Sequence, residues 1–280
     1  MQTIAVPYDK SDFAKAALDF AVQIAETQKA KIKLIHVIEY PLATTFNVSG
    51  EIESYDPMDK IFTLELINKA KETLNLAIEP YTNRVEIDPV MLMGNPYDGI
   101  TSEIENVQAD LIVMGTKGAT GLKELLVGSN TEKIVRNAHC PVLAIHSKCD
   151  FKEIKNIIFA SDLDGSHGDV LDTFVEYQEM FGAKIHLVWV ETPYNSINED
   201  LGKERLETIA KDHALSNYEV HVVKAFKPED GILSYGWQIN ADMIAMSTHS
   251  HKGLLHLFAG SVAEDVVNHS NLPVWTCSIK

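Results

Sequence analysis

The residues best suited to carry chemistry form a glycine-rich pattern in the first half of the chain. Gly115, Gly118 and Gly128-Ser129 are spaced as Gly-x2-Gly-x9-Gly-Ser. Glycines let backbone N–H groups come close to an anion, and a helix that starts at Ser129 adds the positive end of its dipole and a hydroxyl donor. Because the pattern follows the apolar run DLIVMG and precedes a predicted helix, it indicates a phosphate-binding site. Glycines that only shape turns are the alternative.

Residues for catalysis do not stand out in the same way. The chain has no Gly-x4-Gly-Lys-[Ser/Thr] loop, so the lysine of motor-type ATPases is missing. No Ser-His-Asp or Cys-His motif is recognisable. His36 and His146 lie within apolar runs, where a buried and hydrogen-bonded histidine is expected. We therefore assign no catalytic residue, and we expect any nucleotide hydrolysis to be slow.

Histidines gather near the corresponding loop of the second half, at His249, His251, His256 and His269. Zinc ligands are usually paired more closely and joined by cysteine or carboxylate partners. We therefore expect no metal ligands in the chain, with a weak metal site at these histidines as the alternative. The three cysteines are scattered and indicate neither a disulfide framework nor a zinc knuckle.

The sequence repeats itself once. With a shift of 132 residues, the segment 96–142 falls on 228–274, and 19 of these 47 positions are identical. With a shift of 153, Asp9 falls on Asp162, and AKIKLIHV (30–37) falls on AKIHLVWV (183–190). A repeat of this length predicts two copies of one structural unit. We place the domains at residues 1–148 and 153–280, called here the first and second half.

Each half alternates between short apolar runs and helical patterns. In the first half the runs are TIAVPY, KIKLIHVIE, RVEIDPVMLMG, DLIVMG and PVLAIH. Strands that alternate with helices predict right-handed crossovers and a parallel sheet with helices on both faces. Ligands of such α/β folds bind at the carboxyl ends of the strands. The polar insert at residues 42–57 is predicted to be a mobile loop placed to cover a ligand there.

The segment that runs from DLIVMG through Gly-x2-Gly-x9-Gly-Ser into a helix, together with Asp9 at the end of AVPYD, resembles the universal stress protein family. The resemblance covers essentially the whole chain, as a tandem member. It implies two Rossmann-like domains, each with a five-stranded parallel sheet covered by helices, packed on each other as a pseudo-dimer. It also implies that the terminal strands PVLAIH (141–146) and PVWTC (273–277) meet across the interface.

The ATP-binding branch of that family uses this motif for the ribose and the phosphates. The resemblance therefore implies ATP as the ligand, with Mg²⁺ held by the phosphates and Ser129 or Thr131. Asp9 would lie beside the adenosine, and the backbone of Val37 would meet the adenine. The loop residues around the ribose and phosphates would be Gly115, Lys117, Gly118, Gly128, Ser129, Asn130 and Thr131. A helix or turn cap is the alternative for Asp9, and an ordinary surface lysine is the alternative for Lys117.

The second half departs from this pattern. Ser247 and Ser250 stand where the first half has Gly115 and Gly118, and Phe226 replaces Gly94. Side chains at the lost glycines would crowd the phosphate path and resist a positive φ. We therefore expect one nucleotide per chain, bound by the first half.

The resemblance implies an ATP-binding stress-response or regulatory protein that holds its nucleotide with little or no hydrolysis. A slow ATPase or nucleotide-using enzyme is one alternative, and a partner-binding scaffold that works without nucleotide is the other. The net charge of -16 leaves neither half electropositive, so no nucleic-acid partner is expected. No apolar run reaches the roughly 20 residues of a membrane span, and the start of the chain does not resemble a signal peptide. We expect a cytoplasmic protein without a membrane partner, and a homodimer remains open.

Overall fold

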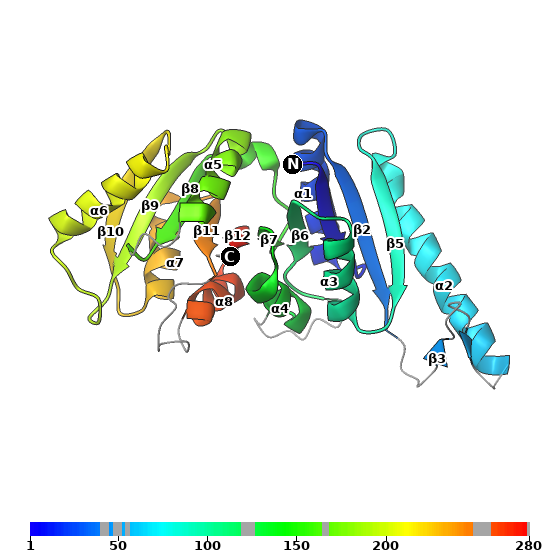
Figure 1. The fold of residues 1–280 in the computed structure, drawn as a ribbon. Helices are drawn as coiled ribbons and strands as arrows, with labels where there is room; N and C mark the ends of the chain where they lie inside the picture. The colour runs from blue at the N-terminus through cyan, green and yellow to red at the C-terminus, as the bar shows by residue number, and fades with distance from the viewer. Residues whose placement is uncertain are drawn as a thin grey trace.

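The computed structural model describes residues 1–39, 45–46, 52–53, 57–118, 127–163, 168–248 and 259–278. Each half contributes five strands to the main sheet and four α-helices, and Figure 1 shows how they are arranged. The elements of the first half are β1 Thr3–Pro7, α1 Asp12–Gln28, β2 Lys31–Ile38, β3 Thr45–Phe46, β4 Ile52–Glu53, α2 Pro57–Ile78, β5 Ile87–Met93, α3 Pro96–Asn106, β6 Leu111–Gly115, α4 Ser129–Asn137 and β7 Val142–Ile145, with β3 and β4 forming a separate small pair. Those of the second half are β8 Asn156–Ser161, α5 Gly168–Phe181, β9 Lys184–Glu191, α6 Glu199–Asp212, β10 Tyr218–Lys224, α7 Pro228–Ile239, β11 Met243–Ser247, α8 Ala259–His269 and β12 Val274–Cys277.

The ten main strands form one continuous sheet, in the order β10-β9-β8-β11-β12-β7-β6-β1-β2-β5. Within this sheet the strands of each half pair in parallel, and the third, second, first, fourth and fifth main strands of each half follow one another across it. This is the order of a Rossmann-like sheet, whose switch point lies between its first and fourth strands. The expected α/β fold with two tandem domains is therefore confirmed.

The halves join where β7 and β12 pair in antiparallel register. Val142 pairs with Thr276 and Val274 with Ala144, so Leu143 and Trp275 face each other at the centre. Because Val142 and Val274 are equivalent positions of the repeat, this register has an approximate twofold axis through the Leu143–Trp275 pair. The expected meeting of the terminal strands is confirmed.

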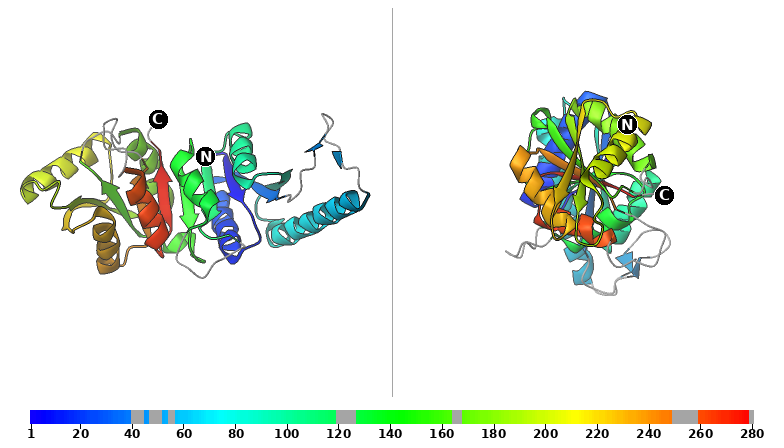
Figure 2. Two further views of the ribbon diagram at one scale, coloured as in Figure 1. Left: turned by 90° about the horizontal axis from the view of Figure 1, so that it is seen from below. Right: turned by 90° about the vertical axis from the view of Figure 1, so that its left-hand side faces the viewer.

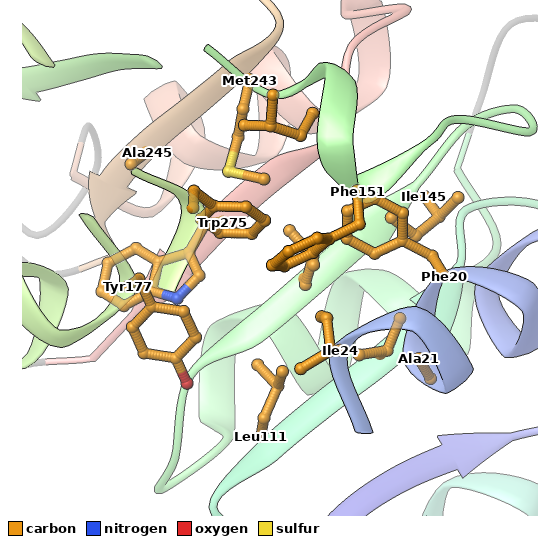
Figure 3. Close-up of a cluster of buried hydrophobic side chains, with 14 of the residues drawn as sticks. Phe20, Ala21, Ile24, Leu111, Ile145, Phe151, Tyr177, Met243, Ala245 and Trp275 are labelled. Carbon is orange, nitrogen blue, oxygen red and sulfur yellow. The ribbon is translucent and has the colours of Figure 1, made fainter. Parts of the chain in front are cut away.

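Helices cover both faces of the sheet, as the view along its long axis shows (Figure 2). One core lies beneath α1, α2, α5 and α6, and the other beneath α3, α4, α7 and α8. The first core runs through both halves. Phe151, in the short 3-10 helix Phe151–Glu153 between the halves, packs against Phe20 of α1 and Phe181 of α5, with ring centroids 6.3 and 4.9 Å away. Figure 3 shows this cluster with Trp275 of β12.

The insert differs in part from its prediction. Its short strands β3 and β4 pair in antiparallel fashion, with Thr45 opposite Glu53, where the sequence predicted only a loop. The rest of residues 42–56 lies outside the described residues, so the expectation that it covers a ligand stays a prediction. Among the described residues, no helix combines the length and apolar character that crossing a membrane requires.

Candidate functional site

A cavity of about 600 Å³ opens at the carboxyl ends of β1, β2 and β6. Its position is the switch point of the first half, where a Rossmann-like sheet binds its ligands. The structure brings all nine residues singled out from the sequence around this one cavity. They are Asp9, Val37, Gly115, Lys117, Gly118, Gly128, Ser129, Asn130 and Thr131.

Asp9 lies beside Gly118, although 109 positions separate them in the chain. A Cβ atom added to Gly118 would lie 2.9 Å from Asp9 Oδ2, so the close approach depends on the missing side chain. The other oxygen, Oδ1, accepts a hydrogen bond of 3.0 Å from the backbone N–H of Ser11. Asp9 therefore stabilises the turn before α1 and also lines the cavity, so the structural role does not exclude a role in binding.

Gly115 is required by close packing against α1. A Cβ atom at this position would lie 2.6 Å from the carbonyl carbon of Phe13 and 2.8 Å from the amide nitrogen of Ala14. Neither Gly115 nor Gly118 has a positive φ. The expectation that these glycines serve a positive φ is therefore wrong, since they are needed for the close approach of neighbouring atoms.

The amino end of α4 faces the cavity without a side-chain cap. Gly128 is the N-cap residue, with φ −65° and ψ 142°, and having no side chain it leaves the first N–H groups of the helix to another acceptor. Its own N–H donates to Thr116 O at 2.8 Å, which holds the loop against the end of β6. Thr131 Oγ1 donates to Gly115 O at 3.0 Å. This helix end is a site for an anion.

Val37 presents backbone groups at an open strand edge. Tyr8 N–H donates to Ile35 O on the β1 side, and Gly94 N–H donates to Ile38 O on the β5 side. Since successive peptide groups of a strand alternate in direction, the amide and carbonyl of Val37 face the β1 side. Strand β1 has already ended at Pro7, so these groups face the cavity. The backbone N–H and C=O of Val37 thus offer one hydrogen-bond donor and one acceptor at the exposed edge of β2, an arrangement that suits a flat heterocycle.

Charged side chains from four segments surround the opening. Lys10, Lys69 and Lys117 line it together with Asp9 and Glu39. Lys117 Nζ lies over the ring of Phe13, 5.9 Å from its centroid, and Lys117 O accepts a hydrogen bond of 3.2 Å from Ser11 Oγ. The lysines supply the positive charge that a phosphate chain needs.

Sequence reasoning missed the wall that α2 contributes. Leu66, Lys69 and Ala70 line the cavity from this helix. Their spacing of three and four residues places them on one helix face, and this was the only available signal. The sequence could not tell which face of α2 turns toward the nucleotide motif.

His36 acts as a structural residue. It is 8% exposed, and its Nδ1 donates to Tyr8 O at 2.6 Å. Burial lowers the pKa of His36, so the ring is neutral and supports the corner that carries Asp9. His146 is likewise hydrogen-bonded, through Nε2 to Val267 O at 2.7 Å. These contacts match the structural reading of both histidines.

The second half reaches the loop of the first. Asn268 of α8 accepts a hydrogen bond of 2.9 Å from the N–H of Val127, directly before Gly128. Arg136 of α4 also pairs with Glu264 of α8. Asn268 belongs to no motif, and only the packing of α4 on α8 brings it to the site.

The corresponding region of the second half differs where Gly115 is replaced. Ser247 ends β11, and the described part of α5 is Gly168–Phe181. Leu163 keeps the left-handed backbone of Lys10, with φ 67° and 73°. Phe226 is 69% exposed, so it fills no enclosed space. Ser250, His249, His251 and His256 lie outside the described residues.

Comparison with known proteins agrees with this architecture. The family model described as "Universal stress protein family" matches the chain twice, at residues 1–146 and 153–278. The universal stress protein MJ0531 of Methanocaldococcus jannaschii is 35% identical over 142 residues, which cover 51% of this chain and 80% of that protein. Slr1230 of Synechocystis is 25% identical over 292 residues, covering 99% of both chains. The crystal structure of a universal stress protein from Archaeoglobus fulgidus has a TM-score of 0.74 at 20% identity and covers 99% of this chain and 98% of that one, a likeness of fold. The chain belongs to the universal stress protein family.

Proposed function

We propose that the first half binds one ATP molecule and holds it as a regulatory ligand with little or no hydrolysis. The observation that carries this proposal is the meeting of three kinds of group at one cavity. These are the uncapped amino end of α4, the open backbone edge at Val37, and the carboxylate of Asp9 beside Gly118. They fit the phosphates, the adenine and the ribose respectively.

The same residues argue for binding more strongly than for turnover. Efficient phosphoryl transfer needs a bound metal, a positioned nucleophile and cations aimed at the developing charge. Mg²⁺ can be held by the phosphates with Ser129 or Thr131, since the Thr131 hydroxyl keeps its oxygen lone pairs while it donates to Gly115 O. The lysines at the cavity can neutralise charge, and none of the hydrogen bonds among the described residues that line it joins a base to a nucleophile. The bound state then stabilises one arrangement of the surrounding loops.

Calorimetric titration of the intact chain with ATP tests the binding. One equivalent is expected for the wild type, and mass spectrometry of small molecules released from the purified protein should identify an adenine nucleotide. Gly118→Val should abolish binding while the fold survives, because the new side chain displaces Asp9. Ser250→Val is the matched control at the corresponding position and should bind like the wild type. Two equivalent nucleotides per chain, or full binding by Gly118→Val, would contradict the proposal.

A nucleotide-using enzyme is the competing function. Steady-state hydrolysis with and without Mg²⁺, on the wild type and on Asp9→Ala, separates the two. Rates far below the ~10 s⁻¹ typical of enzymes are expected. Turnover of tens per second that disappears in Asp9→Ala would instead establish an enzyme.

A further inference from the structure

A second group of chemically active side chains lies in the other half, at the amino ends of β9 and β10. His186 is the third residue of β9, and Glu219 of β10 is its partner in the strand register. Glu219 and His221 are two residues apart on one strand, so all three side chains share one face of the sheet. Tyr235 of α7 packs against both imidazole rings on that face, with ring centroids 6.2 and 5.0 Å away.

The potential ligand atoms of these three residues lie within 4.8 Å of one another. His221 Nε2 lies 3.5 Å from Glu219 Oε2, while the other oxygen, Oε1, is paired with Lys184. Two ligands at roughly 2.0–2.2 Å from a tetrahedral zinc ion lie about 3.4 Å apart. The His221–Glu219 pair therefore already has nearly the separation of two ligands on one ion.

The remaining contacts orient the ligands as a metal site requires. His186 Nε2 lies 3.4 Å from Asn156 Oδ1 on β8, on the opposite side of β9 from Glu219 and His221. Its Nδ1 lies on the Tyr235 side, 3.5 Å from the hydroxyl. A ligating histidine usually donates its other ring N–H to an oxygen, and a ligating carboxylate is itself hydrogen-bonded. Asn156 and Lys184 fill these two supporting roles.

In the first half, a cluster of ion pairs occupies the place that corresponds to the two histidines and Glu219. Lys33 stands at the sequence position of His186 and Glu103 at that of Tyr235. By strand register, Asp88 stands opposite Lys33 as Glu219 stands opposite His186. Lys33 Nζ lies 2.7 Å from Asp88 and 3.3 Å from Glu103, so an ammonium group sits between two carboxylates. The second half has lost this internal cation at the same place and has gained two imidazoles around the remaining carboxylate.

One candidate ligand atom is buried without a hydrogen bond of its own. His221 Nε2 makes no hydrogen bond within the described residues. A deprotonated imidazole nitrogen at this place can serve as a metal ligand.

We propose that His186, Glu219 and His221 bind one divalent transition-metal ion of the zinc class. His186 supplies Nδ1, Glu219 supplies Oε2 and His221 supplies Nε2, which leaves a fourth position for water or another ligand. Two nitrogen ligands and one carboxylate select zinc and its neighbours over Mg²⁺ and Ca²⁺, which prefer oxygen. The site is independent of the nucleotide cavity, and none of its residues belongs to the glycine motif.

The test is titration of the intact chain with Zn²⁺ against a chromophoric chelator, supported by the absorption spectrum of the Co²⁺ form. The wild type should bind one ion, and the Co²⁺ spectrum should be tetrahedral. His221→Val installs valine, the residue that the first half has at this register position (Val90), and should weaken Zn²⁺ binding at least a hundredfold. Glu219→Gln, at a more exposed position, should weaken it by at least as much. Asn156→Ala should weaken it by about 10- to 100-fold. His213→Gln, at a histidine that pairs with Asp172 on another helix, is the matched control and should bind like the wild type.

Three outcomes would overturn the proposal. The first is no stoichiometric binding by the wild type. The second is undiminished binding by both His221→Val and Glu219→Gln, which would place the ion elsewhere, for example on the histidines between residues 249 and 256. The third is equal competition by Mg²⁺ or Ca²⁺. Nucleotide titration and circular dichroism on each variant show that the fold is retained, so loss of metal binding cannot be attributed to unfolding.

Discussion

Gly115 and its counterpart in the second half, Ser247, differ in whether a side chain is present. In the first half the backbone of α1 occupies the space where a Cβ atom would lie, at 2.6 Å from Phe13 C. In the second half Ser247, at the end of β11, carries a Cβ atom at the corresponding position. The glycine thus allows α1 to start close to β6. Ser11 lies at this start, and its hydroxyl donates a hydrogen bond to the carbonyl of Lys117.

Gly115→Ser should therefore destabilise the protein by about 1–3 kcal/mol, the usual cost of forcing extra atoms into a packed site. The free energy of unfolding in urea measures this. The reverse change at the equivalent position, Ser247→Gly, creates no clash and should cost at most about 1 kcal/mol from added backbone freedom. Equal costs for the two variants would show that close packing against α1 does not explain Gly115.

Residues of the cavity differ in how far the sequence could reveal them. The glycines could be found because their spacing along the chain indicates a phosphate-binding loop, and Asp9 because the resemblance to a known family implied it. Lys69 could not, because the position of α2 depends on how it packs after a long insert. His186 and Glu219 are 33 positions apart and meet only through the register of two strands. The glycine spacing also misled in one respect, since it suggested a positive φ where the structure requires close approach.

At the scale of elements, the contact between α8 and the glycine loop couples the halves. Asn268 accepts a hydrogen bond from Val127 at the residue before the N-cap of α4. A loop held from outside keeps the N–H groups of α4 aimed at the cavity. The second half therefore supports the candidate nucleotide site, while the described residues that line the cavity all belong to the first half.

Asn268→Ala should weaken ATP binding by roughly two- to tenfold, which corresponds to the ~0.5–1.5 kcal/mol of one hydrogen bond. Calorimetric titration measures the change. Asn137→Ala is the control, because Asn137 lies on α4 but bonds only to its own helix, through Lys133 O. The coupling idea fails if Asn268→Ala binds as tightly as the control.

The arrangement of the elements was largely predictable from the repeat. Alternating strands and helices predicted the parallel sheets, and the apolar runs 141–146 and 273–277 were expected to meet. The sequence did not show that Phe151 would pack between α1 and α5, because a residue between two repeats has no counterpart to compare with. Its contacts with Phe20 and Phe181 make the connection between the halves part of the core.

At the scale of the whole molecule, buried histidines link stability to pH. His146 lies at the junction of the halves, and burial lowers its pKa despite its bonds to backbone carbonyls. A folded-state pKa below the unfolded value of about 6.5 means that the folded protein resists protonation. The stabilisation is complete above that pH and is lost as the pH falls toward the folded-state pKa.

His146→Gln keeps a donor for Val267 O but cannot titrate. The free energy of unfolding of the wild type should fall from pH 7.5 to pH 5.5, and that of the variant should fall less steeply. His36, His186 and His221 have lowered pKa values as well, so part of the slope should remain. Parallel curves for the two proteins would show that His146 makes no contribution to the pH dependence.

The shared core predicts that the two halves unfold together. Trp275 is fully buried where β7 meets β12, and its ring lies 5.1 Å from Phe174 and 5.3 Å from Tyr177. The core on its side of the sheet continues without a break from α1 and α2 to α5 and α6. A domain pair that shares a core in this way should show a single cooperative transition.

Trp275→Ala should remove about 3–5 kcal/mol of stability, since it leaves a large cavity at the junction. Trp237→Ala is the matched control, because Trp237 is 87% exposed on α7 and its loss should change stability by no more than about 0.5 kcal/mol. Urea unfolding followed by circular dichroism measures both, and the wild type should unfold in one step. Two separate transitions in the wild type, or equal effects of the two substitutions, would mean that the halves are stable on their own and that the junction contributes little to holding the molecule together.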